Sequence, residues 1–199
     1  MSTELGLINA MLAATGSAGV SSTIGRHPGL VRATPILARV NRTVQARGHW
    51  FNTDWGLKLS PTVDNEFILP QTTLKADTTV KSEPYVRRGR RMYDPKTHTS
   101  NIPVPSMLVD VVLQLEYEDL PVTALDLIRT TAILELVANT DVDQISLRVR
   151  ADAQRTANNL FQSERLSQAD YNLRDNPQYA RIIGGAFKGR HLTANRIGG

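Results

Sequence analysis

Two stretches near the beginning of the chain carry apolar residues at helical spacing. In the first, Leu5, Ile8 and Leu12 share one face of a short helix that Gly16 can end. Residues 17–28 are rich in Gly, Ser and Thr and are typical of a loop. In the second stretch, the apolar stripe consists of Ile36, Leu37, Val40 and Val44, and the polar residues expected to lie away from it are Arg39, Arg42 and Gln45.

Proline and glycine residues set the predicted bounds of this second helix. Proline is tolerated in a first turn, so either the helix begins near Thr34 or an earlier turn is kinked at Pro35. Gly48 can adopt the left-handed conformation that ends a helix without a Cβ penalty. The aromatic residues that follow can then fold back, and we expect them to pack between the helix and a β region: Trp50, Phe51 and Trp55.

Between Leu57 and Tyr117 the period of the pattern changes to two, which predicts a small, mostly antiparallel β region with long loops. The clearest strand runs until Pro121 and alternates at Met107, Val109, Val111, Leu113, Leu115 and Tyr117, with Asp110, Gln114 and Glu116 on the other face. Shorter alternations occur at Leu74, Ala76, Thr78 and Val80, and at Phe67 and Leu69. The sequence Asp94-Pro95-Lys96-Thr97 predicts a turn.

Two more helices are predicted after Pro121. The first is apolar around nearly its whole circumference, and such a helix has to be covered on every side. Its apolar residues are Leu125, Leu127, Ile128, Ala132, Ile133, Leu134, Leu136 and Val137. The second helix is predicted to begin after an N-cap residue, Thr140 or Asp141. The residue three positions on, Asp143 or Gln144, would return the capping hydrogen bond. Its apolar positions are Ile145, Val149, Ala153, Leu160 and Phe161, and its cations, solvated or at an interface, are Arg148, Arg155 and Arg165.

Together these elements predict an α+β fold, in which a helical bundle built from both chain ends carries an inserted small antiparallel β domain. The predicted parts are N-terminal helices in 1–56, the β region in 57–120, C-terminal helices in 121–175 and a basic tail in 176–199. The tail has no acidic residue and many glycines, so it cannot bury enough apolar surface to fold alone, and we expect an extended C-terminal arm. Its basic residues include Arg181, Lys188, Arg190 and Arg196.

Composition narrows the class of protein. The chain has 199 residues, of which 41% are hydrophobic and 21% charged, an ordinary globular balance. It contains no cysteine, which excludes disulfides, thiol catalysis and cysteine-ligated metal. The N-terminus lacks the basic flank of a signal peptide, and no apolar run approaches the roughly 20 residues that cross a bilayer. We therefore expect a soluble protein made in the cytoplasm, with no membrane partner.

Charge is distributed unevenly although the formal net charge is only +4. Residues 81–98 carry six cations against Glu83 and Asp94, whereas residues 110–126 carry five acids and no base. Head-to-tail assembly requires two different, complementary surfaces on each subunit, and these patches fit that requirement. The alternative is that they pair across strands within one subunit or are solvated loops.

Catalytic motifs are weak in this sequence. The four histidines lie in different segments without the spacing of a metal site, and there is neither a nucleophile elbow nor a phosphate loop. Glu116, Glu118 and Asp119 imitate a glycosidase pair, but on one strand the two glutamates would be only about 7 Å apart along the backbone. We predict no enzymatic activity, no cofactor and no metal site.

The end of the second helix resembles the signature of the tail tubular protein A family of short-tailed bacteriophages. The matching residues are Asn41, Arg42, Gln45, Arg47, Gly48, Trp50, Phe51 and Asn52. His49 departs from the pattern, because the family usually has tryptophan directly after the glycine. Three further blocks match in order: Tyr85 to Gly89, Tyr93-Asp94, and Glu118-Asp119-Leu120-Pro121. The segment Gly89-Arg90-Arg91-Met92 is more basic than the family pattern.

The resemblance implies a structural adaptor in the virion tail, a dodecameric ring between the portal protein and a nozzle protein similar to tail tubular protein B. It also implies tail fibres at the side of the ring and DNA passing through its bore. The interface residues we predict are Arg87, Arg88, Arg90, Arg91, Glu116, Glu118 and Asp119, and the predicted portal-binding residues are Arg181, Lys188, Arg190 and Arg196.

Two other functions are considered beside the adaptor. One is a nucleic-acid-binding protein that uses the basic loop and tail, because cations that neutralise phosphates give salt-dependent affinity. Against it, Tyr85 and Tyr93 are too few aromatic residues near the loop for a stacking platform. The other is a tail-associated glycan hydrolase.

Overall fold

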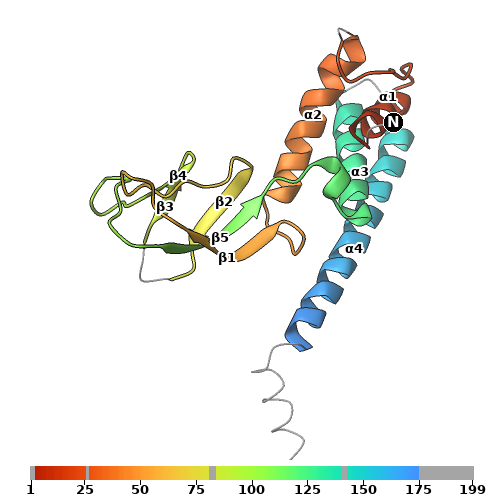
Figure 1. The fold of residues 1–199 in the computed structure, drawn as a ribbon. Helices are drawn as coiled ribbons and strands as arrows, with labels where there is room; N and C mark the ends of the chain where they lie inside the picture. Colours follow the sequence, from red (N-terminus) through yellow and green to blue (C-terminus); the bar gives the residue numbers. More distant parts are fainter. Residues whose placement is uncertain (1–2, 26, 81–83, 140–142, 175–199) are drawn as a thin grey trace, which may run out of the picture. The chain divides into compact units, whose positions relative to one another are not determined.

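The computed structural model describes residues 3–25, 27–80, 84–139 and 143–174 (Figure 1). The chain divides into two compact units, Met1–Phe161 and Gln162–Gly199. The described part of the first unit contains all of the sheet and most of the helical residues, and that of the second unit is the end of the last helix. The predicted arm, including Arg181, Lys188, Arg190 and Arg196, lies outside the described residues.

The helices of the first unit pack around one apolar core. They are α1 (Thr3–Ala14), α2 (Pro28–Gln45), the short 3-10 helix η1 (Tyr117–Asp119), α3 (Val122–Ala138) and α4 (Gln144–Arg174), which continues into the second unit. Figure 1 shows α1, α2 and α3 lying against one another, and each pair of these helices is in contact. Ile8, Leu37, Ile128 and Phe161 are almost completely buried in this core, so segments from both halves of the chain build it.

The five strands of the described residues form one antiparallel sheet. They are β1 (Thr53–Leu59), β2 (Thr73–Thr78), β3 (Val86–Arg88), β4 (Arg91–Tyr93) and β5 (Met107–Leu113), in the spatial order β1-β5-β2-β3-β4. A second core packs against the sheet, with Phe67, Met92, Met107 and Val109 almost completely buried. The α+β class predicted from the sequence is confirmed.

The second helix begins before Pro35, as in the second of the two predicted alternatives, and not near Thr34. It begins at Pro28, where the His27 ring nitrogen Nδ1 accepts the Gly29 N–H at 3.1 Å, and it continues through Pro35. Proline is favourable at the first helical position, because its missing N–H would have no helical partner there. Gly48 ends the turn after the helix with a φ of 75°, as predicted.

The cap of α4 differs from the prediction. Asp143 itself accepts the N–H groups of Ile145 and Ser146, each at 2.9 Å, so the helix begins after it, whereas Thr140 and Asp141 lie outside the described residues. These contacts, led by the Ser146 N–H, hold the pKa of Asp143 below its usual value. Of the apolar positions predicted in α4, Phe161 is buried but Ile145, Val149 and Leu160 are exposed.

The long strand predicted before Pro121 is wrong at its C-terminal end. Strand β5 stops at Leu113, and Tyr117 belongs to η1 and packs in the helical core together with Leu115. The short strand predicted at Phe67 and Leu69 does not form. Both side chains are buried as the alternation predicts, but the backbone makes an isolated bridge there, between Ile68 and Arg91. No helix in the described residues has the length and apolar character needed to cross a membrane.

Candidate functional site

A buried polar latch joins the end of α2 to the segment that leaves β5. The Gln45 side chain accepts the Leu115 N–H at 2.8 Å and donates to the Leu115 carbonyl at 3.0 Å. It also donates to Asn41 Oδ1 at 2.8 Å. The prediction that Gln45 lies away from the core is therefore wrong: it is 0% exposed because it satisfies a backbone that has left the sheet.

Asn52 forms the second half of the latch. Its amide donates to the carbonyls of Gln45 at 2.9 Å and Leu113 at 2.8 Å, and its Oδ1 accepts the His49 N–H at 2.8 Å. The same side chain thus holds the turn after α2 and the last residue of β5. Because the side chains of Asn41, Gln45 and Asn52 are engaged in these hydrogen bonds within the chain, this part of the signature has a structural role.

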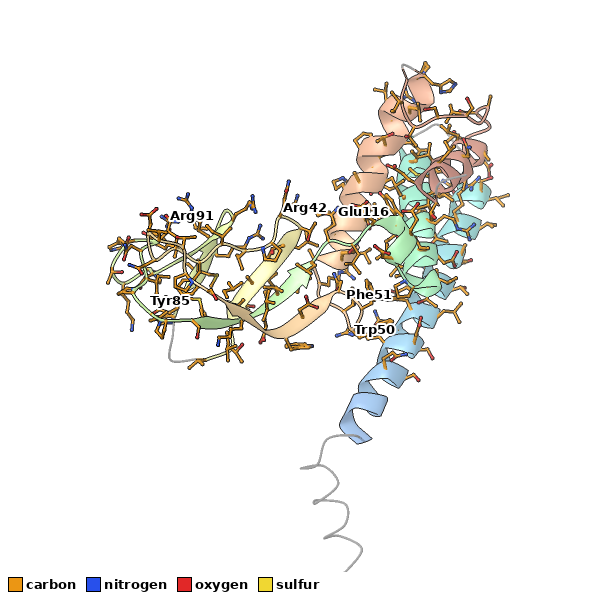
Figure 2. All side chains as sticks on the ribbon, viewed as in Figure 1. Arg42, Trp50, Phe51, Tyr85, Arg91 and Glu116 are labelled. Carbon is orange, nitrogen blue, oxygen red and sulfur yellow. The ribbon has the colours of Figure 1, made fainter. Side chains whose placement is uncertain are left out.

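The aromatic residues of the signature pack against α4. His49 is buried, its Nε2–H donates to the Val44 carbonyl at 2.9 Å, and its ring stacks on Phe51 with 5.4 Å between ring centroids. Trp50 and Phe51, labelled in Figure 2, both contact the Phe161 ring, at 5.5 and 6.4 Å between centroids. They therefore pack on the helical core, whereas Trp55 is 76% exposed and the packing predicted for it is wrong.

The basic cluster lies on the hairpin of β3 and β4, and most of its arginines are engaged within the chain. Arg87 donates to the carbonyls of Gly89 and Leu74. The guanidinium carbon of Arg88 lies 3.6 Å from the centre of the Tyr93 ring, and Arg91 pairs with Glu66 at 3.1 Å. Arg90 is exposed and its side chain has no hydrogen bond or ion pair with any described residue. Arg90 is thus the cation of this cluster that is best placed for an external partner.

The acidic residues follow β5 and lie on the segment that leads from the sheet to α3. Figure 2 shows Arg91 in the β3–β4 part of the sheet and Glu116 next to the helices. Glu116, Glu118 and Asp119 are exposed, and Glu118 accepts the Thr3 N–H at 3.1 Å. None of the ion pairs between described residues joins this acidic turn (Glu116, Glu118 and Asp119) to the basic hairpin.

The carboxylate geometry assumed for a hydrolase is wrong. Glu116 precedes the 3-10 helix and Glu118 lies within it, so the two do not share a strand face. Within the described part of the chain, no group of three or more His, Asp or Glu residues is placed to hold a metal ion. The alternation of apolar and polar residues predicted a strand here because it continues through Tyr117, although the backbone leaves the sheet after Leu113.

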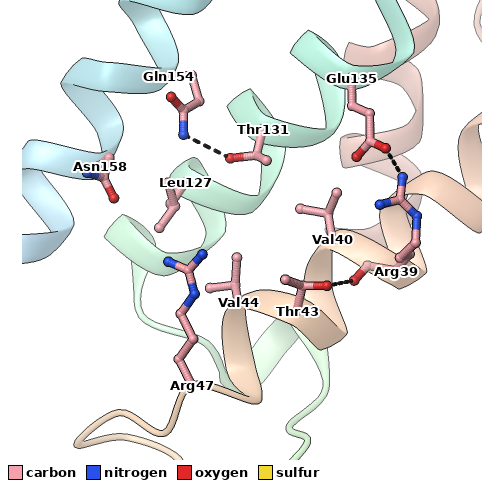
Figure 3. A pocket seen from close by; sticks show the side chains of 10 residues that line it. All are labelled: Arg39, Val40, Thr43, Val44, Arg47, Leu127, Thr131, Glu135, Gln154 and Asn158. Atoms are coloured by element: carbon pink, nitrogen blue, oxygen red, sulfur yellow. Dashed lines mark hydrogen bonds and ion pairs between the residues drawn. The ribbon is translucent and has the colours of Figure 1, made fainter. Parts of the chain in front are cut away.

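A pocket between α2, α3 and α4 was not predicted. Its volume is about 150 Å³, and its lining consists of Arg39, Val40, Thr43, Val44, Arg47, Leu127, Thr131, Glu135, Gln154 and Asn158 (Figure 3). Arg39 pairs with Glu135, and Gln154 lies 3.5 Å from the Thr131 hydroxyl. Figure 3 shows the Arg47 guanidinium directed toward Leu127, and its side chain has no polar partner among the residues described. Sequence pattern carried no signal for this pocket, because three helices form it.

Comparison with known proteins identifies the family. A sequence profile of the family described as "Tail tubular protein" matches residues 5–176, which is most of the chain. The chain belongs to the tail tubular protein family. The resemblance that the signature around Gly48 predicted is thereby confirmed.

A relative within this family is the tail tubular protein A of Klebsiella phage KP34, which is 30% identical over 118 residues. The aligned part is 59% of this chain and 62% of the relative, so the chain spans less than two thirds of that relative's length. Membership of the tail tubular protein family makes this chain a structural component of a phage tail. The family match includes the latch, the basic hairpin, the acidic turn and the pocket, and ends before Arg181.

Proposed function

We propose that this protein is an adaptor subunit that forms a ring between the portal and the nozzle of a phage tail. In this role it contributes to DNA retention and passage and to the attachment of tail fibres. The observation that carries the proposal is the separation of two oppositely charged surfaces, the basic hairpin and the acidic turn, in a chain of the tail tubular family. Surfaces that differ within one subunit and complement each other between subunits produce head-to-tail contacts, which close into rings.

The latch supports this function because it fixes the acidic turn relative to α2. Gln45 bonds Leu115, which lies immediately before Glu116, and Asn52 bonds Leu113 at the end of β5. A ring of many copies requires a constant angle between the two interfaces of each subunit, since a small error accumulates around the ring. Buried, fully bonded polar groups hold such an angle more firmly than a flexible linker does.

The binding of nucleic acid as the main function is less well supported. Glu66 compensates the charge of Arg91, and carbonyls and an aromatic ring hold the guanidinium groups of Arg87 and Arg88. Fewer of their N–H groups are therefore free to bind phosphates. Contact with DNA remains part of the adaptor proposal through the bore of the ring.

Negative-stain microscopy of the purified chain, with and without portal rings from the same phage, tests the adaptor proposal. We expect an additional annular layer on the portal, and we expect a chain ending at Asn176 to remain folded but to lose portal binding. Failure of the complete chain to oligomerise or to bind the portal would reject the proposal. Salt-sensitive retention of duplex DNA without ring formation would favour a nucleic-acid-binding protein, and degradation of cell-wall glycan would favour a hydrolase.

A further inference from the structure

The pocket between α2, α3 and α4 has an excess of positive charge. It is lined by two cations, Arg39 and Arg47, and by one carboxylate, Glu135, which Arg39 already binds. The charge of Arg47 is therefore not compensated within the pocket. The apolar part of the lining is formed by Val40, Val44 and Leu127. Such a lining lowers the local dielectric and strengthens any ion pair made there.

The pocket has the size and the donors to receive one side chain. Its volume of about 150 Å³ is about ten times the roughly 10 to 15 Å³ of such space that one water molecule needs. Beside Arg47, the amides of Gln154 and Asn158 line the same space. Amides and a guanidinium together can donate several hydrogen bonds to a carboxylate. The chemistry therefore favours an acidic side chain as the ligand.

The acidic turn lies on the other side of α2. Successive helical residues are rotated by about 100°, so residues two apart point in nearly opposite directions. Arg39 and Thr43 line the pocket, whereas Asn41 and Gln45 face the Tyr117 and Leu115 segment. The acidic turn consequently cannot reach the pocket of its own subunit, although its charge complements it.

We propose that the pocket receives a carboxylate from the acidic turn of a second copy of this chain, supplied by Glu116 or Asp119. Both residues are exposed, and neither is in an ion pair with a described residue. Each copy offers the pocket on one side of α2 and the acidic turn on the other, so the contact is head-to-tail and repeats from copy to copy. This inference rests on the proposed ring. It assigns the acidic turn to the pocket of the neighbouring copy and leaves the basic hairpin for the other partners in the tail.

Charge reversal at Arg47 is the first test. In the assay on portal rings, Arg47→Glu should reduce the number of closed rings at least tenfold, because it places a carboxylate where the neighbouring carboxylate has to bind. The matched control is Arg42→Glu, which changes an exposed arginine in the last turn of α2 that does not line the pocket and should leave ring formation unchanged. Circular dichroism should show that both monomers are folded. Their melting temperatures should fall by similar, small amounts, because each reversal places a negative charge at the C-terminal end of α2.

Compensating reversal on the partner surface is the second test. The double variant Glu116→Arg and Asp119→Arg should lose ring formation, and adding Arg47→Glu to it in the same chain should restore at least half of the rings. Rings that form normally with Arg47→Glu alone, or a failure of the combined variant to recover, would overturn the proposed contact. Absence of rings in the wild type would instead reject the adaptor proposal itself, so the two failures can be distinguished.

Discussion

At the scale of single residues, the signature at the end of α2 divides by role. Gln45 and Asn52 satisfy backbone groups near the exit from the sheet, and Asn41 accepts a hydrogen bond from the Gln45 amide. Trp50 and Phe51 cover Phe161. Arg42 and Arg47, by contrast, are exposed and have no polar partner in the described residues. The signature therefore combines a structural latch with two exposed arginines, of which Arg47 lines the pocket between α2, α3 and α4.

Replacement of Gln45 by alanine should be strongly destabilising. The change removes bonds to both polar groups of Leu115 and leaves a part-buried N–H and carbonyl without partners. We expect the free energy of unfolding to fall by about 1 to 3 kcal/mol, the cost of polar groups that lose their partners away from water. Urea unfolding measures this loss, with Arg42→Ala as an exposed control on the same helix. Equal stability of the two variants would contradict the latch.

Stability should also depend on Tyr117 at high pH. Burial raises the pKa of Tyr117 to about 12, with repulsion from Glu4 adding to the effect and a hydrogen bond from Asn41 opposing it. The unfolded phenol loses its proton near pH 10. The stabilising contribution is therefore complete below about pH 10 and is lost as the pH rises toward 12.

This dependence can be isolated by substitution. The free energy of unfolding, measured in urea between pH 9 and 11.5, should decrease more steeply for the wild type than for Tyr117→Phe, which has no ionisable group at this position. Parallel pH profiles for the two proteins would show that Tyr117 does not ionise differently in the folded and unfolded states.

At the scale of elements, the end of α2 was predicted more accurately than the end of β5. Gly48 ends the helical turn with its positive φ, because that conformation is a local property of glycine. The end of β5 depended on a distant partner, because Gln45 binds Leu115 across 70 residues of sequence. Alternation alone continued to Tyr117 and therefore predicted too long a strand.

Gly48 should be less tolerant of substitution than Gly16. Both have positive φ, 75° and 69°, but a Cβ at Gly48 would lie 3.1 Å from Val112 Cγ2, whereas nothing lies within 4 Å at Gly16. We expect Gly16→Ala to cost about 1 kcal/mol from backbone strain, and Gly48→Ala about 2 kcal/mol or more. Thermal and urea unfolding compare the two. A smaller effect at Gly48 would mean that Val112 moves away without cost.

At the scale of the whole molecule, charge is divided between surfaces that do not meet within the described chain. The hairpin of β3 and β4 lies at one edge of the sheet, and the acidic turn follows β5, which pairs with β1 at the opposite edge. The described ion pairs therefore do not join the acidic turn to the basic hairpin within one subunit, as the alternative of pairing across strands required. Opposite charges kept apart in one subunit are available to its neighbours.

Reversal of Arg90 should impair assembly or attachment without affecting the fold. The Arg90 side chain is exposed and makes no bond with a described residue, so Arg90→Glu should change the free energy of unfolding by less than about 0.5 kcal/mol. Microscopy of portal, nozzle and fibre complexes should nevertheless show reduced attachment. Arg91 is unsuitable for this test because its reversal would also break the pair with Glu66.

A control for Arg90 is Lys58→Glu, which changes an exposed cation on β1, the opposite edge of the sheet. Similar losses with both variants would indicate a general effect of net charge, and normal complexes with Arg90→Glu would remove the hairpin from the proposed interfaces.

The sequence by itself determined the elements whose cause is local. The stripe of α2, the glycine stop after it and the Asp94 turn depend on neighbouring residues, and the signature was sufficient to indicate the family. Only the tertiary structure decided that Gln45 is buried, that β5 ends at Leu113 and that Arg47 lines a pocket. These features arise where segments distant in sequence meet, and the free energy of such contacts leaves no periodic pattern along the chain.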